Sequence, residues 1–533
     1  MNDLLYFNGV NASTGEYLTP PLPADQLAQI ARGETSAPDN LQELQKRGDP
    51  NAPHLGVTVD ANDLAQTGWG VIFAQDIDPA VRDALRELLE YRKAQANRVK
   101  ELYREFSYNA GESKNLFLAR QGVGPGVVEP DKVPYYLLIV GAPDKIPYNF
   151  QYQLDVAYAV GRIHFDSPAD YAQYAQSVVR AEKENIARGK HAAFLGVVNP
   201  DDFSTQQSAN YLVKPLAEKM RALKTDWTYE TYLGEEATKA QLETLLRDKT
   251  PAFLFTASHG AAFNLGDPRQ MKQQGALIST EWQPNAMRGQ AIPQTMYYAA
   301  DDVTSDANVN GMIAFHFACY GAGTPREDEF SHLRQGASTR AQIAPAPFVA
   351  NLSKKLLAHP KGGALAVIGH IDRAWGSSFV WDKDIAQTGT FENALQKIFE
   401  GAPVGAATEF FNNRYAELAA SFSSDLEDLK FGKKVDSAAL AYLWTANNDA
   451  RGYAIVGDPA VRLNVNGKKD SAPARATLTL AVESKTDAGL DVTNLDGALE
   501  KMEQQIAALA ETIKELRAAI KEHSLNKSQG GQE

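Results

Sequence analysis

Residues 311–321 read GMIAFHFACYG, an apolar run of strand length that ends near Cys319, the only cysteine among 533 residues. An apolar run without polar alternation is typical of a strand buried on both faces of a sheet. Amphipathic helical stretches separate this run from similar ones at 135–141, 191–199, 251–260, 363–371 and 453–463. The alternation predicts βαβ units, and therefore an α/β fold with a mostly parallel sheet flanked by helices.

The flanking regions differ from this central pattern. Residues 1–130 mix short strand-like pieces and loops with one expected helix at 84–106, which predicts a small N-terminal α+β accessory domain. The α/β domain then covers 131–465. We expect a linker with a short strand at 466–492, a coiled-coil helix at 493–523 and a disordered tail at 524–533. The coiled coil is predicted because apolar residues recur at alternating gaps of four and three: Leu495, Leu499, Met502, Ile506, Leu509, Ile513, Leu516 and Ile520.

The composition argues against several classes of protein. There are 66 acidic and 53 basic residues, for a net charge of −13, which argues against a binder of nucleic acid or anionic membrane. We expect a cytoplasmic protein, because the start lacks a signal-peptide pattern and no run of about 18 apolar residues occurs. A single cysteine forms no intramolecular disulfide. The histidines lack a metal-ligand spacing, so we expect neither a metal nor a cofactor.

Two strand ends carry side chains suited to catalysis. His259 follows the apolar run in FLFTASHG, and Cys319 follows the run in AFHFACYG. If the two strands are parallel neighbours, these ends lie close together. A thiol becomes a strong nucleophile when an imidazole at hydrogen-bond distance takes its proton. The backbone N–H groups of Gly260 and Cys319 are candidates to face an oxyanion. The alternative is an inert, buried thiol. His316, inside the strand, is interpreted as a structural histidine.

Four ordered motifs, between about 135 and 465, resemble the caspase-like (clan CD) cysteine peptidases of the gingipain and CHAT types. The sequence SHG followed by AC is similar to their His-Gly and Ala-Cys signatures. The segment 135–163 resembles the gingipain stretch with Ile-Pro before an aspartate and a Gly-Arg. The segment GGALAVIGHIDRAWGSSF, 362–379, resembles their strand and substrate-wall loop. YAIVGDPAVRL, 453–463, resembles their closing Gly-Asp-Pro strand.

This resemblance implies a caspase/gingipain-like fold and a Cys-His dyad. Cys319 would be the nucleophile, His259 the general base and acid, and the backbone of Gly260 an oxyanion partner. The family needs no third triad residue.

The resemblance also implies a substrate pocket. Asp155 falls where gingipain-type enzymes place the carboxylate of the S1 pocket, and Trp375 where they place an aromatic wall. Asp372 is a rival for the pocket acid. A buried carboxylate binds Arg or Lys through charge-assisted hydrogen bonds, which predicts cleavage after basic residues. The chain departs from the family at Leu154 and Ala142, which replace a small residue and an aspartate.

The leading hypothesis is therefore a regulated intracellular cysteine endopeptidase that acts on protein substrates. Residues 493–523 would make it a homo-oligomer or bind a partner protein. The loop at 324–347 is a candidate for self-cleavage at Arg326, Arg334 or Arg340. One alternative is a non-catalytic or conditionally active scaffold that works through its coiled coil. Another is a cysteine hydrolase acting on a non-peptide amide.

Overall fold

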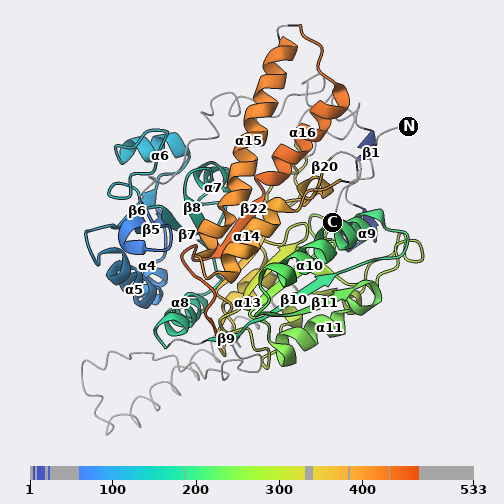
Figure 1. The fold of residues 1–533 in the computed structure, drawn as a ribbon, viewed down its shortest axis with the longest axis horizontal. Coiled ribbons are helices and arrows are strands. Elements are labelled where there is room, and N and C mark those ends of the chain that lie inside the picture. The colour runs from blue at the N-terminus through green and yellow to red at the C-terminus, as the bar shows by residue number, and fades with distance from the viewer. Residues whose placement is uncertain are drawn as a thin grey trace, which may run out of the picture. The chain divides into compact units, whose positions relative to one another are not determined.

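A ten-stranded sheet runs through the part of the chain that the structure, a computed structural model, describes (Figure 1). The described residues are 4–5, 9–17, 22–23, 59–184, 187–329, 340–381, 385–430 and 432–466. Contacts divide the chain into two units, Met1–Leu478 and Thr479–Glu533, and every described residue belongs to the first. The predicted coiled-coil helix at 493–523, the tail at 524–533 and the linker beyond residue 466 lie outside the described residues.

The sheet has the strand order β11-β10-β12-β16-β19-β22-β8-β7-β5-β6. In chain order its strands are β5 (Trp69–Ala74), β6 (Tyr103–Tyr108), β7 (Tyr136–Val140), β8 (Ala159–Ile163), β10 (His191–Gly196), β11 (Thr228–Leu233), β12 (Phe253–Ala257), β16 (Ile313–Phe317), β19 (Ala366–His370) and β22 (Tyr453–Gly457). All six apolar runs of the sequence therefore form strands of one sheet, and the predicted α/β fold with a mostly parallel sheet is confirmed.

Every pair of neighbouring strands in this sheet is parallel except β19 with β22. The five strands from β22 to β6 consequently run opposite to the five from β11 to β19. The carboxyl ends of β12, β16 and β19 thus lie at the same edge of the sheet as the amino ends of β22 and β8. Residues from both halves of the chain meet at this edge.

Helices pack against the sheet and against one another. Of these, α10, α14 and α15 lie side by side over the sheet in Figure 1, and α15 packs along α16. The helices are α3 (Leu64–Thr67), α4 (Pro79–Ala84), α5 (Arg86–Ala96), α6 (Lys114–Arg120), α7 (Tyr148–Asp155), α8 (Pro168–Lys183), α9 (Phe203–Ser208), α10 (Lys214–Leu223), α11 (Lys239–Thr244), α12 (Gln270–Gln273), α13 (Asn351–Leu357), α14 (Gly389–Phe399), α15 (Val404–Lys430) and α16 (Ser437–Ala450).

Short strands complete the framework around the sheet. Two of them, β2 (Val10–Asn11) and β13 (Ala261–Ala262), pair in parallel with each other. The others are β1 (Leu4–Leu5), β3 (Glu16–Tyr17), β4 (Leu22–Pro23), β9 (Arg188–Gly189), β14 (Leu277–Ile278), β15 (Tyr297–Tyr298), β17 (Gly323–Thr324), β18 (Phe348–Val349), β20 (Val380–Trp381), β21 (Ile385–Ala386) and β23 (Val465–Asn466).

The region predicted as an accessory domain contributes to the central sheet. Strands β5 and β6 pair with each other, and β5 pairs with β7 beyond the predicted boundary at residue 130. That boundary falls inside one continuous sheet. The helix expected at 84–106 is also shorter than predicted. It ends near Ala96, because the side chain of Asn97 accepts hydrogen bonds from the N–H groups of Leu102 and Tyr103, where β6 begins.

Glycines allow the two halves of the sheet to join closely. A Cβ atom added at Gly161 of β8 would lie 2.1 Å from the carbonyl oxygen of Gly457 in β22, far inside van der Waals contact. Gly457 itself has φ +135°, a conformation that favours glycine. The glycines of the Gly-Arg and Gly-Asp-Pro motifs thus allow β8 and β22 to pack closely where the two half-sheets join.

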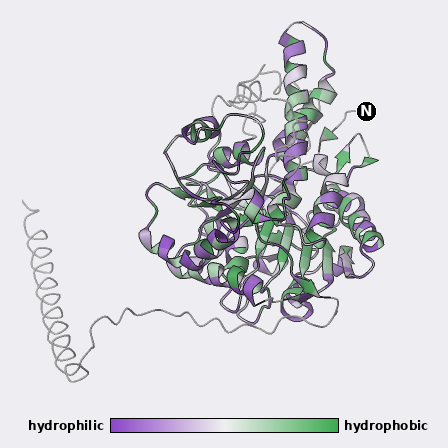
Figure 2. Cartoon of the chain, turned by 60° about the vertical axis from the view of Figure 1, so that its left-hand side comes forward, coloured by the Kyte–Doolittle hydropathy of each residue, from purple (hydrophilic) through white to green (hydrophobic). Residues whose placement is uncertain are grey.

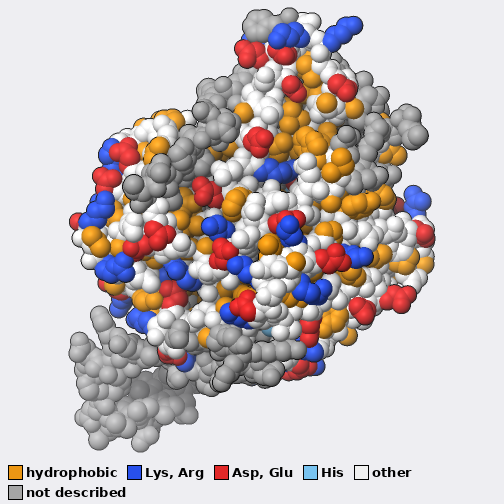
Figure 3. Space-filling view, viewed as in Figure 1, with side chains coloured by type: hydrophobic (Ala, Val, Ile, Leu, Met, Phe, Trp, Pro, Cys, Tyr) orange, Lys and Arg blue, Asp and Glu red, His pale blue; other side chains and the backbone are white. Residues whose placement is uncertain are grey.

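The core is apolar and the surface is mixed in charge. Figure 2 shows hydrophobic residues concentrated in the sheet, and the side chains of Val71, Leu138, Phe255, Phe315 and Ile368 are completely buried. Acidic and basic side chains are interspersed on the face drawn in Figure 3. No helix among the described residues combines the length and hydrophobicity that a bilayer crossing requires.

Candidate active site

The register between β12 and β16 places His259 across from Cys319. Ala257 pairs with Phe317 at the ends of the two parallel strands, and each chain continues two residues further to the predicted site residue. The N–H of Ser258 donates to the carbonyl oxygen of Phe317 at 3.2 Å and extends the ladder past the strand ends. Both predicted residues thus lie at adjacent strand ends.

Gly260 is in direct contact with the backbone of Cys319. A Cβ atom added at Gly260 would lie 1.8 Å from the carbonyl oxygen of Cys319 and 2.9 Å from its nitrogen. Only a residue without a side chain fits between the two strand ends. The neighbouring carbonyl of His259 accepts a hydrogen bond from Ile278 at 3.0 Å, which fixes the chain on the other side.

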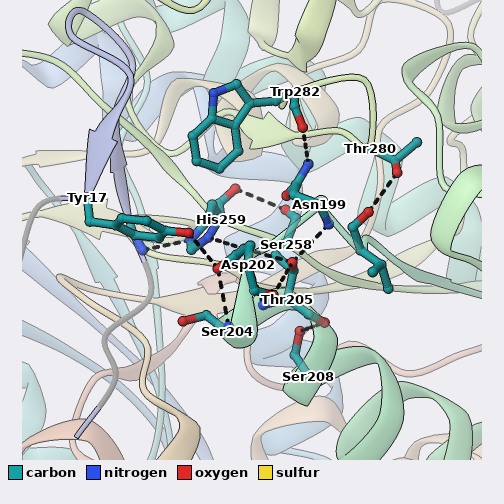
Figure 4. Close-up of polar contacts among 12 residues, drawn as sticks. Tyr17, Asn199, Asp202, Ser204, Thr205, Ser208, Ser258, His259, Thr280 and Trp282 are labelled. Carbon is teal, nitrogen blue, oxygen red and sulfur yellow. Dashed lines mark hydrogen bonds and ion pairs between the residues drawn. The ribbon is translucent and has the colours of Figure 1, made fainter. Parts of the chain in front are cut away.

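A buried carboxylate holds one side of the His259 ring. The Nε2 atom of His259 lies 2.7 Å from Oδ2 of Asp202, and neither side chain is appreciably exposed (Figure 4). Asp202 also begins α9, where its side chain accepts from the N–H groups of Ser204 and Thr205. The hydroxyl groups of Thr205 and Tyr17 donate to it as well, both at 2.7 Å. Asp202 is therefore fixed by contacts on both oxygens.

The electrostatics of this pair follow from its surroundings. Burial alone would raise the pKa of Asp202, but His259 and the hydrogen bonds from Tyr17 and Thr205 hold it well below its usual range. The rings of Tyr17 and Trp282 contact the imidazole edge-on, with centroids 5.4 Å and 5.7 Å away. Asp202 is thus ionised at neutral pH and accepts the Nε2–H of His259.

The other nitrogen of His259 faces the N-terminal part of the chain. The backbone N–H of Gly9 donates to Nδ1 at 3.0 Å. Since Nδ1 accepts this bond, it carries no proton, and the proton of the neutral imidazole is on Nε2, where Asp202 accepts it. Nδ1 therefore holds the lone pair with which His259 can act as a base.

Cys319 is completely buried at the end of β16. Its Sγ atom lies 3.9 Å from the carbonyl oxygen of Ala374. Burial raises the pKa of the Cys319 thiol to about 12. The thiol is therefore protonated in this arrangement, and activation requires that a base accept its proton.

Strained backbone surrounds the thiol. Tyr320 has φ +62° and Asp372 has φ +70°, although neither is glycine, and the N–H of Tyr320 donates to the carbonyl oxygen of Asp372 at 2.7 Å. Non-glycine residues in this left-handed region are uncommon and cluster at functional sites. The two turns follow neighbouring strands, β16 and β19, and each stabilises the other.

A buried cluster of charges lies beside Asp372. Arg373 pairs with Asp328 at 2.7 Å, and Arg451 pairs with Glu329. The two carboxylate oxygens of Asp372 are buried and make no hydrogen bond among the described residues. Burial raises the pKa of Asp372 to about 8. Asp372 is thus an acidic group with unused acceptor capacity next to the strand end that carries Cys319.

The model of peptidase family C25 matches residues 70–464, well over half of the chain. The chain belongs to peptidase family C25. It is a cysteine peptidase, and the resemblance to gingipain-type enzymes of clan CD is confirmed at the level of the family.

Several solved structures are similar to this C25 peptidase. One described as a protease shares 13% identity, with 78% of this chain and 80% of that chain covered and a TM-score of 0.42. The Arg-specific cysteine proteinase gingipain R (RgpB) shares 12%, with 74% and 78% covered and a TM-score of 0.37. A complex of the pro- and mature domains of RgpB from Porphyromonas gingivalis shares 10%, with 74% and 80% covered and a TM-score of 0.38. No curated protein matches the chain.

The predicted pocket residues of the C25 peptidase are all buried, and they follow the carboxyl end of β19 or precede the amino end of β8, at the same edge of the sheet. Asp155 is the last residue of α7 and precedes β8, which β19 and β22 separate from β16 in the sheet. It lines a small cavity together with Val160, Ile368, Thr408, Phe411, Asn412, Tyr453, Ala454 and Ile455. Burial raises the pKa of Asp155, and its carboxylate accepts a hydrogen bond from the backbone of Val160. Trp375 is buried, and its backbone N–H donates to Oδ1 of Asp449 at 2.8 Å.

His316 and the loop at 324–347 complete the comparison with the sequence. The ring of His316 lies within the sheet, 2.8 Å from the hydroxyl of Thr256, and burial lowers its pKa to about 4. It lies in the strand, as interpreted from the sequence.

The two ends of the loop at 324–347 pair between Glu327 and Gln342, whereas residues 330–339, including Arg334, lie outside the described residues.

Sequence reasoning missed Asp202 and Tyr17. Asp202 follows the apolar run of β10, so the strand-end argument that selected His259 and Cys319 applies to the sequence NPDD at 199–202 as well. Tyr17 had no comparable signal, because no local pattern indicates that this tyrosine reaches a carboxylate 185 residues away. The family resemblance implied a dyad without a third residue, so neither Asp202 nor Tyr17 was predicted.

Proposed function

We propose that this C25 peptidase is an endopeptidase that cleaves protein substrates after Arg or Lys, with Cys319 as the nucleophile and His259 as the general base. The observation that supports this most is the register of β12 and β16, which brings these two residues to adjacent strand ends. The 2.7 Å contact between His259 and Asp202 adds a group that orients the base.

In the proposed reaction, Nδ1 of His259 takes the proton of the Cys319 thiol, and the thiolate attacks the carbonyl carbon of the scissile peptide bond. The negative oxygen of the tetrahedral intermediate lies against the N–H groups of Gly260 and Cys319. Nδ1–H then protonates the leaving amine as the C–N bond breaks, which leaves a thioester on Cys319. A water molecule loses a proton to Nδ1 and attacks the thioester, and the carboxylic acid product and the thiol are released.

Asp202 has a positioning role in this scheme. It accepts the Nε2–H of His259, so the ring can present only Nδ1 to the thiol. As Nδ1 gains a proton, the imidazolium lies beside an ionised carboxylate, which stabilises the positive charge. Its low pKa keeps Asp202 ionised throughout the working pH range.

Peptidase activity can be tested with an electrophilic peptide probe that carries Arg at the position before the reactive group. The probe is expected to attach to the chain's only cysteine, as read by mass spectrometry of the labelled peptide. Labelling that disappears in both Cys319→Ala and His259→Ala would support the dyad. Equal labelling of His259→Ala and the wild type would remove His259 from the role of base.

Preference for basic residues is proposed to depend on a carboxylate near Cys319. Asp372 and Asp155 are the two candidates, and Trp375 is the proposed pocket wall. Asp372 is favoured because its backbone carbonyl accepts a hydrogen bond from the N–H of Tyr320, the residue after the nucleophile. Its carboxylate oxygens also have unused acceptor capacity. Asp155 ends the helix before β8, a strand that β19 and β22 separate from β16, and its carboxylate already accepts a hydrogen bond from the backbone of Val160.

The Asp372→Asn variant is expected to lose about tenfold or more in kcat/KM for substrates with Arg before the cleaved bond, because a charge-assisted hydrogen bond is lost. With the pKa of Asp372 near 8, kcat/KM for Arg substrates should rise with pH up to about 8, and this rise should vanish in the variant. Kinetics with Arg and norleucine substrates across pH 6–9 measure both effects.

Asp155→Ala is the comparison variant. If it alone abolishes the preference for Arg while Asp372→Asn retains it, the pocket acid is Asp155.

The pH dependence of protein stability gives a second measure of the ionisation of Asp372. A carboxyl group whose pKa is raised on folding lowers stability as pH rises from about 4 towards 8. Asp372→Asn should therefore raise the melting temperature at pH 8 more than at pH 5.

We further propose that this C25 peptidase is a regulated effector of the CHAT type. Residues 493–523 would join copies of the chain to one another or bind a partner protein. The sequence pattern supports the second part, and the complete burial of His259 and Cys319 supports regulation.

A further inference from the structure

The segment 9–17, here called the N-terminal strap, lies against the residues that follow His259. Its strand β2 pairs in parallel with β13, and the carbonyl of Ala262 accepts a hydrogen bond from the N–H of Ala12. The carbonyl of Ala12 in turn accepts from the N–H of Ile292 at 2.9 Å. The strap thus contributes β2 and β3 to the three-stranded sheet β13-β2-β3, which joins it to residues about 250 positions away in the sequence.

Apolar and polar contacts fix the strap. The side chains of Val10 and Ala12 are completely buried in a cluster that is separate from the main core. This cluster contains Ala261, Phe263, Ala276, Ile278, Trp282, Ile292, Tyr297 and Ala299. At the edge of the cluster, Asn11 bonds to Asn264 and Ser13 bonds to Asp267, both at 2.6 Å. The seat of the strap is local, so it can open without disturbing the central sheet.

The strap forms hydrogen bonds with the base of the proposed dyad and with the carboxylate that holds this base. Gly9 donates its N–H to Nδ1 of His259 at 3.0 Å, and Tyr17 donates its hydroxyl to Asp202 at 2.7 Å. Gly9 has φ +120°, a conformation that favours glycine. Nδ1 is the nitrogen that must accept the thiol proton, because Nε2 is already bonded to Asp202.

Occupation of Nδ1 has a direct chemical consequence. While the N–H of Gly9 uses the lone pair of Nδ1, that lone pair does not accept the proton of Cys319. Both residues of the proposed dyad are also completely buried, so a peptide cannot reach them in this arrangement. The proposed active site is therefore closed to substrate in this structure.

We propose that the N-terminal strap keeps the peptidase latent, and that catalysis requires Gly9 to leave His259. This inference rests on the proposed function, because it gives Nδ1 the role of the base. The strap acts as a displaceable strand of the chain itself: when it is withdrawn, the lone pair of His259 becomes available and the edge of β13 beside the dyad is uncovered.

The single cysteine gives a readout of the strap that does not depend on peptidase activity. Any thiol reagent that modifies the protein must modify Cys319, the only cysteine in the chain. The rate of modification by iodoacetamide therefore reports how often Cys319 is accessible and deprotonated. Wild-type protein is expected to react slowly, since the thiol is buried.

The main variant is Val10→Asp, which places a charge in the completely buried seat of the strap. Its matched control is Val99→Asp, the same change at a side chain that is 76% exposed. Val10→Asp is expected to raise both the rate of thiol modification and kcat/KM by at least about tenfold, as the fraction of open molecules increases. Val99→Asp should match the wild type in both measurements.

A second variant, Gly9→Pro, removes the N–H donor and cannot adopt the positive φ of Gly9. It is expected to act in the same direction as Val10→Asp. Circular dichroism and the melting temperature show that each variant remains folded, so that faster modification reflects release of the strap.

The outcomes separate the strap from the peptidase mechanism. Faster modification without peptide hydrolysis in any variant supports the strap and contradicts the proposed function. Unchanged modification and activity in both folded variants overturns the strap. A fall of kcat/KM below the wild-type value also overturns it, because the segment would then be a working part of the site.

Discussion

Replacing Asp202 by asparagine is expected to lower kcat/KM by about 10²- to 10⁴-fold, the range typical of lost acid–base catalysis. Every contact that the structure gives to the Asp202 carboxylate comes from a donor: Tyr17, Ser204, Thr205 and His259. An amide NH₂ group must therefore face another donor or the Nε2 atom of His259. In the second case the imidazole proton moves to Nδ1, and the base is lost. Steady-state kinetics with a peptide substrate measure the effect.

Asp201→Asn is the matched control for this prediction. Asp201 is the preceding residue, is exposed, and has φ +57°, a conformation that asparagine tolerates. It should retain the activity and the melting temperature of the wild type. If Asp201→Asn and Asp202→Asn are equally active, His259 does not need a carboxylate partner, and the proposed positioning role of Asp202 is excluded.

The second large effect is expected for Gly260→Ala. The added methyl group would lie 1.8 Å from the carbonyl oxygen of Cys319, so the two strand ends must move apart. Overpacking of this kind costs about 1–3 kcal/mol of unfolding free energy. A displacement of roughly 1 Å between reacting groups costs about 100-fold in rate. We expect kcat/KM to fall by at least that factor, together with a lower melting temperature.

Gly124→Ala serves as the control, because a methyl group there meets no atom within 4 Å and the residue has no positive φ. It should change neither activity nor melting temperature. A Gly260→Ala protein with wild-type activity would show that the strand ends separate without loss of function. The oxyanion role proposed for the N–H of Gly260 would then lose its structural support.

The fold was predictable to the extent that strands are buried on both faces. The six apolar runs form β7, β10, β12, β16, β19 and β22, because a strand between two layers of helices needs apolar residues on each face. Edge strands follow a different rule. In β6 the sequence YREFSY mixes buried residues with exposed ones and has no continuous apolar run, and its first residues were predicted to be helical. The reversal of direction at β22 is also absent from any local pattern.

The geometry of the candidate site was predictable where it depends on strand ends. His259 and Cys319 could be found because each follows an apolar run, and the parallel pairing of β12 with β16 then brings them together. The contact of Gly9 with His259 spans 250 residues and uses a backbone N–H, which every residue except proline possesses. No residue type marks such a contact, so the sequence gives no signal for it.

The position of β22 has a consequence for the order in which the molecule is built. This strand, Tyr453–Gly457, is the last of the ten in the chain, yet it lies between β19 and β8 and joins the two half-sheets. Until residue 457 has been synthesised, the half-sheet that carries His259 and Cys319 has no partner on its β19 edge. Such long-range pairing also forms slowly, because the ends of a very long loop must meet. Chains released before this point would have an unfinished sheet, so translation through Gly457 is required before the two half-sheets can join.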